Sequence, residues 1–338
     1  MIGPEKLSVL LPVYNTRSDW LSLAIESVLN QTYRDFELLL LNDGSTNPDT
    51  LATLAAFEKA DNRVRLVHNP ENMGLPKTLN RGLTLARYDW IARMDGDDIS
   101  EPQRFERQLA YLGRHPDIAI LGTELMAFGD KQEIFHYAER HEDIVTAMLW
   151  VCSIPHPTVM YRKEVILAAG GYPTDYPNAE DYALWTKIVA HHPNVRFAIV
   201  PEVLFKYRMT LSRPDYYKVQ QTSTVRIQEE LFSSLGLRAE DVRMWFKPTS
   251  RLTERELQKY EAVLSRDFET LRQHPFIAEG TLRDRLGYIV RKAVKRALPS
   301  PYALRRAGSL LLRREAYLDS LFPKKAPTKP ASDSLYSK

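Results

Sequence analysis

The chain has 338 residues, 44% hydrophobic and 26% charged, with a net charge of +3 at pH 7, which are ordinary values for a globular protein. This charge is too mild to predict nucleic acid as a partner, and the single cysteine, Cys152, excludes an internal disulfide and fits a reducing compartment. The N-terminus lacks the pattern of a signal peptide, and no stretch approaches the roughly 18 apolar residues of a membrane span. We therefore expect a cytoplasmic protein.

Short apolar runs alternate with helical patterns through the first hundred residues. Each apolar run ends at turn residues, which predicts buried strands at 7–13, 36–41, 64–68 and 90–94. Helices are predicted between them, at 21–29, 49–59 and 77–87. This order calls for an α/β fold with a mostly parallel central sheet flanked by helices.

Polar and acidic residues follow three of the predicted strands at the point where each strand ends. They are Pro-Val-Tyr-Asn at 12–15, Asp-Gly-Ser at 43–45 and Asp-Gly-Asp-Asp at 95–98. Ligands of an open parallel sheet bind at the carboxyl ends of its strands. The sequence therefore predicts a binding site at this edge.

The acidic cluster at 95–98 is the strongest single signal of chemistry. Its three carboxylates repel each other unless a cation or solvent relieves them, and carboxylate oxygens suit Mg²⁺ or Mn²⁺ shared with a ligand's phosphates. An acidic turn or a helix N-terminus would use the same residues. The buried strand that leads into the cluster favours the site. Asp43-Gly44 is by itself a common turn, and its place on the same edge favours a nucleotide contact.

Beyond residue 100 the pattern changes. Residues 101–210 mix a helix, short strands and loops, and residues 211–280 look helical. Residues 281–314 contain ten Arg or Lys and a single acid. The last stretch, 316–338, is predicted to be a disordered tail, because it offers almost nothing to bury.

The basic segment, 281–315, carries an apolar stripe at helical spacing. Its members in the first helix are Leu282, Leu286, Ile289, Val290, Ala293, Val294, Ala297 and Leu298. Basic residues lie mostly off this stripe, and basic amphipathic helices are typical of a peripheral anchor on an anionic membrane surface. A helix that packs on the rest of the chain with a solvated basic face, or a protein contact, would give the same pattern.

Four segments resemble, in the expected order, the family 2 glycosyltransferases of the GT-A fold. They are SVLLPVYN at 8–15, SVLNQTYRDFELLLLNDGST at 27–46, NMGLPKTLNRGLTLARYDWIARMDGDD at 72–98 and AEDYALW at 179–185. The resemblance covers roughly 6–210 and implies a catalytic domain over 1–210, with a nucleotide-binding half (1–100) and an acceptor-side half (101–210). Residues 211–280 would then form a helical extension.

The resemblance implies an inverting transfer of a sugar from a nucleoside-diphosphate donor, most often UDP, to a hydroxyl of a glycan or lipid-linked acceptor. By position, the donor would be contacted by Pro12, Tyr14, Asn15, Asp43, Lys77, Asn80, Asp95 and Asp98. Asp97 would bind Mn²⁺ or Mg²⁺ directly, with Asp95 beside it. Surface polysaccharide synthesis is the expected setting.

Asp181, in the pair Glu180-Asp181, matches the family's catalytic base. A sugar hydroxyl is a poor nucleophile, and a carboxylate within hydrogen-bond reach can take its proton as it attacks the anomeric carbon. The neighbouring Glu180 raises the proton affinity of the pair. A surface acidic pair at a helix start is the alternative.

Three positions stay open. His156 would contact phosphate or acceptor, or be structural, and Trp185 would stack on a sugar or belong to the core. Many relatives have Tyr-Arg-x-His after the base, whereas this chain has Thr210 in place of the histidine.

Other functions would use some of the same features. A nucleotidyltransferase also needs a nucleotide-binding sheet and carboxylates, but it usually has a Gly-rich basic loop where this chain has 12–15. A catalytically silent sugar-nucleotide or glycan-binding subunit would not need a base. A nucleic-acid-binding protein would rely on the basic segment alone.

Overall fold

The computed structural model of the protein describes residues 6–210, 214–245, 251–297, 300–312 and 314–324. The chain divides into two compact units, unit 1 (Met1–Ala239) and unit 2 (Glu240–Lys338). No helix in the described part of the chain is both long and apolar enough to cross a membrane.

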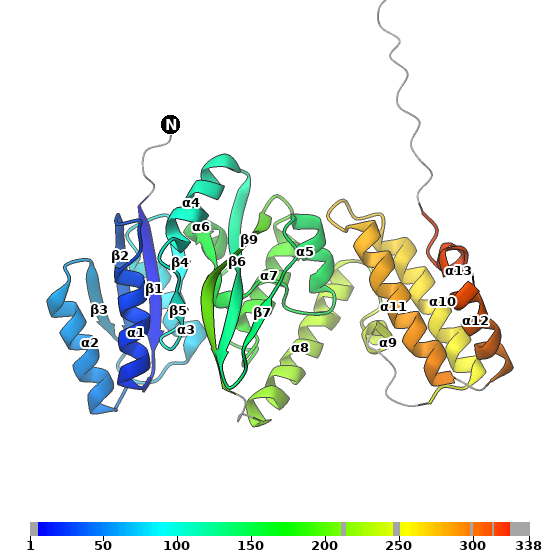
Figure 1. Cartoon of the computed structure of the whole chain (residues 1–338), viewed down its shortest axis with the longest axis horizontal. Helices are drawn as coiled ribbons and strands as arrows, with labels where there is room; N and C mark the ends of the chain where they lie inside the picture. Colours follow the sequence, from blue (N-terminus) through cyan, green and yellow to red (C-terminus); the bar gives the residue numbers. More distant parts are fainter. Residues whose placement is uncertain (1–5, 211–213, 246–250, 298–299, 313, 325–338) are drawn as a thin grey trace, which may run out of the picture. The chain divides into compact units, whose positions relative to one another are not determined.

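Four parallel strands form the first half of the sheet in unit 1. They are β1 (Leu7–Val13), β2 (Phe36–Asn42), β3 (Val64–His68) and β4 (Trp90–Arg93), in the spatial order β3-β2-β1-β4 (Figure 1). In register, Leu7 lies beside Phe36 on one side and Trp90 on the other. All four strands begin at the predicted residues. The prediction holds because short, continuously apolar runs are typical of strands that are buried on both faces of a parallel sheet.

Three helices connect these strands, as predicted. They are α1 (Ser18–Leu29), α2 (Pro48–Ala60) and α3 (Leu75–Leu85). Asn47 caps α2 by accepting hydrogen bonds from the backbone N–H groups of Asp49 and Thr50. Helix α3 begins two residues earlier than predicted, because Pro76 fits the first turn, where no backbone N–H is needed.

The second half of the sheet is mixed. β8 (Met160–Arg162) runs antiparallel between β4 and β6 (Ile118–Gly129), and β9 (Arg196–Met209) pairs in parallel with β6. The predicted α/β class is thus confirmed, with parallel pairing confined to the first half and the β6–β9 pair. Because β6 and β9 run in the same direction as β4, their carboxyl ends lie at the same edge as residues 95–98.

Two short strands and five helices complete the described part of unit 1. They are β5 (Ile99–Ser100), β7 (Glu133–Phe135), α4 (Arg104–Arg114), α5 (His141–Met148), α6 (Lys163–Ala168), α7 (Glu180–His191) and α8 (Pro214–Ser234). A 3-10 turn, His156–Thr158, precedes β8.

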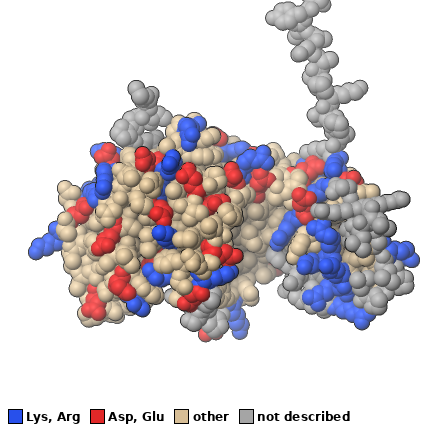
Figure 2. All heavy atoms as spheres, in the orientation of Figure 1, with Lys and Arg blue, Asp and Glu red and all other residues tan. Residues whose placement is uncertain are grey.

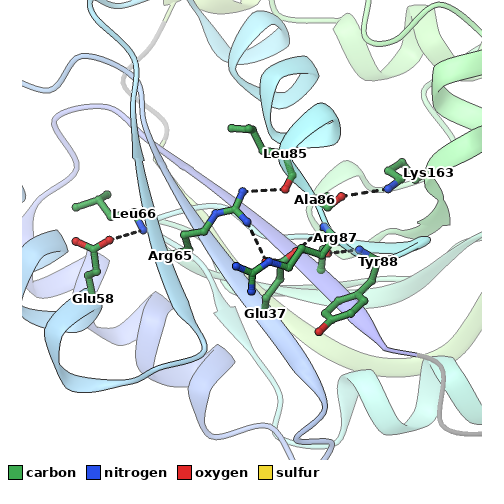
Figure 3. Close-up of polar contacts among 10 residues, drawn as sticks. Glu37, Glu58, Arg65, Leu66, Leu85, Ala86, Arg87, Tyr88 and Lys163 are labelled. Atoms are coloured by element: carbon green, nitrogen blue, oxygen red, sulfur yellow. Dashed lines mark hydrogen bonds and ion pairs between the residues drawn. The ribbon is translucent and has the colours of Figure 1, made fainter.

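A buried carboxylate closes the opposite edge of the sheet (Figure 3). Glu37 on β2 accepts hydrogen bonds from Ser8 Oγ and from Arg87 N, each 2.7 Å long. Arg65 on β3 lies 3.4 Å from the same carboxylate and donates to Leu85 O at the end of α3 (Figure 3). These contacts join β1, β2 and β3 to the connection between α3 and β4. The polar residues at the amino ends of the strands therefore stabilise the fold.

Unit 2 is a small helical bundle. Its helices are α9 (Val242–Trp245), α10 (Glu254–Leu271), α11 (Glu279–Ala297), α12 (Pro301–Leu312) and α13 (Arg314–Leu321). The predicted apolar stripe of α11 is buried inside the unit, each member at most 2% exposed, and Leu298 lies outside the described residues.

The end of the bundle differs from the predicted tail. Residues 316–321 belong to α13, because Tyr317 and Leu318 are buried and the Tyr317 hydroxyl donates to the buried Glu261 on α10. The described part of the predicted tail ends at residue 324. Its remainder, 325–338, lies outside the described residues.

Candidate active site

A pocket of about 510 Å³ opens in unit 1 at the edge where β4 and β9 end. Four acidic residues line it, namely Asp95, Asp97, Glu180 and Asp181. Two arginines and four aromatic residues line it as well: Arg93, Arg208, Phe135, Tyr137, Tyr207 and Tyr216. The fold thus brings the predicted metal-binding residues and the predicted base, far apart in sequence, into one pocket.

Arg93, the last residue of β4, is a buried cation in this pocket. Its side chain is 3% exposed and forms an ion pair with Asp95. Burial raises the pKa of each of the other three carboxylates that line the pocket, and the charge of Arg93 counters part of that rise. The sequence patterns did not indicate Arg93, although a charged residue within an otherwise apolar strand was an available signal.

The two aspartates after Gly96 have different surroundings. Burial, followed by the negative charge of Asp95, raises the pKa of Asp97 to about 6. Asp98 is 1% exposed, and one of its oxygens accepts a 2.6 Å hydrogen bond from Arg208 N. Asp95 and Asp97 therefore face the pocket, while Asp98 supports the turn behind it.

Asp95 and Asp97 form a donor set that fits Mn²⁺ or Mg²⁺. Both are partly buried carboxylates, and a divalent cation would relieve their mutual repulsion. Within the described ranges, no group of three or more His, Cys, Asp or Glu side chains is arranged to hold a metal ion. The protein would therefore supply two carboxylates, the usual share when phosphate oxygens and waters complete the coordination shell. Thr210 lines the pocket and offers no nitrogen ligand.

Arg208, near the end of β9, holds the acidic turn in place. Its guanidinium lies between the rings of Trp20 and Phe128, 4.4 Å from each centroid. Its Nε donates to Asp97 O over 2.8 Å, and its backbone N donates to Asp98. The motif at 207–210 contains this arginine, but only the fold shows that it connects β9 to the turn after β4.

Glu180 and Asp181 occupy the first turn of α7, where the helix dipole favours negative charge. Burial, followed by the charge of Asp181, raises the pKa of Glu180 to about 7. Burial also raises the pKa of Asp181, against hydrogen bonds that favour its charged form. One of these comes from the Cys152 thiol, whose Sγ lies 3.4 Å from Asp181 Oδ2. This contact was not predicted, and no sequence pattern pointed to it.

Asn15 and Asp43 brace the sheet edge through backbone contacts. Asn15 has a left-handed backbone (φ 49°), and its Oδ1 accepts hydrogen bonds from the backbone of Thr46 and Asn47. Asp43 is 4% exposed and accepts hydrogen bonds from Asn69 Nδ2, Met73 N, Gly74 N and Thr78 Oγ1. Gly44, at φ 70°, is required because a Cβ there would lie 2.4 Å from the backbone of Glu71.

The other predicted nucleotide contacts are less uniform. Tyr14 is 51% exposed, Lys77 is exposed and Pro12 is half-buried. Asn80 clamps the backbone of Tyr172, donating to its O over 2.9 Å and accepting from its N over 2.7 Å. Of the described residues, those that line the pocket do not include Pro12, Tyr14, Asn15, Asp43, Lys77 or Asn80.

The structure decides between the alternatives for Trp185 and gives the surroundings of His156. Trp185 is fully buried and packs edge-on against Phe197, so it belongs to the core. His156 lines the pocket but is 6% exposed, with Nε2 3.0 Å from the Tyr172 hydroxyl. Burial holds the pKa of His156 well below its usual value, so this ring is neutral.

The sequence is similar to those of known proteins. The family model described as Glycosyl transferase family 2 matches residues 8–167. The O-antigen biosynthesis glycosyltransferase WbnJ of Escherichia coli is 33% identical over 207 residues, 61% of this chain and 80% of that protein. The amylovoran biosynthesis glycosyltransferase AmsE of Erwinia amylovora is 33% identical over 207 residues, 60% of this chain and 75% of that protein.

Solved structures share the fold. S. aureus TarS 1–349 in complex with UDP has a TM-score of 0.55 and 17% identity, covering 90% of this chain and 92% of that chain. The mannosyltransferase PcManGT from Pyrobaculum calidifontis, in complex with GDP-Man and Mn²⁺, has a TM-score of 0.52 and 16% identity, covering 95% and 86%. At these identities the likeness confirms the predicted GT-A fold and leaves the ligands of this chain to its own residues.

The raised pKa of Glu180 predicts an unusual dependence of stability on pH. The folded state holds this proton up to about pH 7, whereas the unfolded state releases it near 4.5, so stability falls as pH rises between these values. Glu180→Gln removes this effect, and we expect its stability gain over the native chain to be roughly 2 kcal/mol larger at pH 8 than at pH 5.

Urea unfolding followed by tryptophan fluorescence, without divalent cations, measures this difference. Trp20, Trp90, Trp150 and Trp185 report on unit 1. The control Glu58→Gln changes an exposed carboxylate whose hydrogen bond from Leu66 N the amide oxygen can still accept, so it should alter stability little at either pH. An equal effect of Glu180→Gln at both pH values would contradict the prediction.

Proposed function

The chain belongs to the family 2 glycosyltransferases, and we propose that it is an inverting, metal-dependent hexosyltransferase that uses a nucleoside-diphosphate sugar. The observation that carries the proposal is that Asp97 and Asp181 line one pocket of about 510 Å³ at the carboxyl edge of the sheet. The acceptor is a hydroxyl of a glycan or a lipid-linked glycan. Relatives named for O-antigen and amylovoran biosynthesis support surface polysaccharide synthesis as the setting.

In this proposal Asp181 is the general base. The acceptor hydroxyl gives its proton to the Asp181 carboxylate as its oxygen attacks the anomeric carbon of the donor. The Cys152 thiol, with Sγ 3.4 Å from Asp181 Oδ2, orients this carboxylate. In-line attack from the side opposite the leaving group inverts the anomeric configuration.

Asp95 and Asp97 would hold Mn²⁺ or Mg²⁺, which supplies positive charge to the departing nucleoside diphosphate. Arg208 keeps Asp97 in position by binding its backbone oxygen, and Arg93 orients Asp95. Tyr14, Lys77 and the braced turns at Asn15 and Asp43 are the proposed nucleotide contacts, in part through backbone groups. Pro12, Asn80 and Asp98 support these contacts at the same edge.

The family resemblance favours UDP, but the fold accommodates more than one nucleotide. TarS is known in complexes with UDP and UDP-GlcNAc, and PcManGT in a complex with GDP-Man and Mn²⁺. The nucleotide is therefore the first property to establish.

Calorimetric titration with UDP, GDP and dTDP, each with and without Mn²⁺, tests the donor site. We expect UDP to bind and Mn²⁺ to strengthen its binding, because Asp97 would hold the metal, whose positive charge would favour the diphosphate. Asp97→Ala should weaken the Mn²⁺-dependent binding by at least about tenfold. The control Asp117→Ala removes an exposed carboxylate before β6 and should bind as the native chain does. Unchanged affinity of Asp97→Ala with Mn²⁺ would refute the metal role.

The variant Asp181→Asn tests the base. It keeps the size and most contacts of the side chain but cannot take a proton, so nucleotide affinity should stay within about twofold while transfer falls on the order of 10²–10⁴-fold. Release of nucleoside diphosphate from the donor, with glycan acceptors present, measures the rate. Asp117→Asn again serves as the control. Transfer at the native rate by Asp181→Asn would remove this residue as the base.

We also propose that unit 2 binds the anionic face of the membrane, which would place the protein peripherally on the cytoplasmic side. Figure 2 shows Lys and Arg side chains gathered on this unit. Tyr288 on α11 is 41% exposed, with Arg285 and Lys292 each within 5.5 Å of its ring centroid. Because the apolar stripe of α11 is buried in the unit, the attraction would come from charge, at about 1 kcal/mol per basic residue, and from Tyr288 at the interface.

Sedimentation with vesicles tests this surface. The native chain should bind vesicles that contain phosphatidylglycerol, should not bind pure phosphatidylcholine, and should release as salt rises, since exposed charges are screened. The double variant Lys295→Glu/Arg296→Glu should lose most of this binding. The control Lys59→Glu/Arg114→Glu makes the same charge change on unit 1 and should retain it. Binding to DNA without binding to anionic vesicles would favour a nucleic-acid partner.

A further inference from the structure

The first turns of α8 present polar and aromatic side chains to the active-site pocket. Tyr216 and Gln220 both line it and lie four residues apart, on one face of the helix. Tyr216 is 38% exposed. Tyr217, its neighbour in the helix, is 44% exposed and packs edge-on against Tyr216 with ring centroids 5.8 Å apart.

These turns are anchored beside the proposed base. Asn178, with a left-handed backbone (φ 61°), lies three residues before Asp181 and donates from Nδ2 to Tyr216 O over 3.3 Å. Further along α8, Ser223 Oγ donates to Pro177 O over 2.9 Å, and Gln228 donates to Trp150 O over 3.0 Å. The segment that carries Glu180 and Asp181 and the helix that carries Tyr216 are therefore fixed to each other.

The chemistry of this end of the pocket suits one class of molecule. Tyr216 and the 36%-exposed Tyr207 provide aromatic faces, while Asn178 and Gln220 provide amides. A pyranose ring has an apolar C–H face and a polar rim, so it can lie against an aromatic ring and hydrogen-bond at its edge.

A phosphate group would fit this end poorly. The carboxylates of Glu180 and Asp181 would repel it. The two arginines that line the pocket are already engaged, Arg93 with Asp95 and Arg208 with the Asp97 backbone and two aromatic rings.

We propose that the acceptor is recognised here as a saccharide, by a pyranose ring that stacks on Tyr216 and hydrogen-bonds to Gln220 and Asn178. The inference rests on the proposed function, because it takes Asp181 as the group that receives the acceptor's proton. The same pyranose could belong to a free glycan or to the sugar end of a lipid diphosphate. A lipid phosphate without a sugar would not be an acceptor.

Ligand-observed NMR titration tests the inference without requiring turnover. The probes are methyl glycosides of glucose, galactose, N-acetylglucosamine and rhamnose, and the β-1,4- and α-1,3-linked disaccharides of the first three, each with UDP and Mn²⁺ present. At least one should bind the native chain. Tyr216→Ala should weaken it at least fivefold, while Tyr216→Phe, which keeps the ring, should stay within twofold. The control Val219→Ala truncates an exposed apolar side chain of the same helix that does not line the pocket, 42% exposed, and should also stay within twofold.

UDP affinity, measured in parallel, should be equal in all four proteins, which shows that each is folded. Absence of binding by every glycoside, or equal binding by Tyr216→Ala and the native chain, overturns the inference. If the native chain binds a sugar through Tyr216 but binds no nucleotide, the saccharide site is supported and the transferase proposal is contradicted. If the native chain binds nucleotide and Tyr216→Ala binds the sugar as the native chain does, the transferase proposal is supported and the saccharide site is contradicted.

The source of the saccharide is distinguished by a second arm. The tightest glycoside is compared with the same sugar on undecaprenyl diphosphate in neutral vesicles. Equal affinity would support a free glycan, and tighter binding of the lipid form that still depends on Tyr216 would support a lipid-linked one. Binding of undecaprenyl phosphate alone, with loss in Tyr216→Ala, would overturn the saccharide assignment.

Discussion

The buried ion pair between Arg93 and Asp95 is the contact on which the site depends, because it places one fixed positive charge among several carboxylates. Asp97, Glu180 and Asp181 share the pocket, and burial alone would drive each toward its neutral form. Arg93 ends β4, where its backbone N donates to Val159 O over 2.9 Å. The position of this charge is therefore set by the sheet and needs no ligand.

The edge of the sheet is ordered by side chains that bind backbone. Asn15 bridges the end of β1 to the turn after β2, Asp43 accepts hydrogen bonds from the backbone of the segment just before α3, and Asn80 joins α3 to Tyr172. Because these groups are already fixed, little conformational entropy would be lost at this edge when a ligand binds. This edge of the sheet is thus preorganised, and the proposed nucleotide would meet side chains that are already fixed.

Unit 2 shows how one pattern fits two structures. An apolar stripe on a basic helix is expected both for a membrane-surface helix and for a helix packed in a bundle. In this chain the stripe of α11 faces its own bundle, and Tyr317 and Leu318 extend that bundle into residues predicted to be tail. The proposed membrane contact would therefore rely on the basic surface around Tyr288.

The first four strands, the three helices that connect them and the order of the acidic motifs could be predicted from the sequence, because buried apolar runs and turn residues are local signals. The sequence also predicted one site for Asp95, Asp97 and Asp181, and the fold brings these three residues into one pocket. Only the tertiary structure showed Arg93, Arg208, Cys152 and Tyr216 beside these residues, and it assigned Trp185 to the core. These contacts join β4, β9, the 152 segment and α8, which lie far apart in the chain. No periodicity or motif records such pairs, because long-range contacts arise only once the sheet has set the directions of its strands.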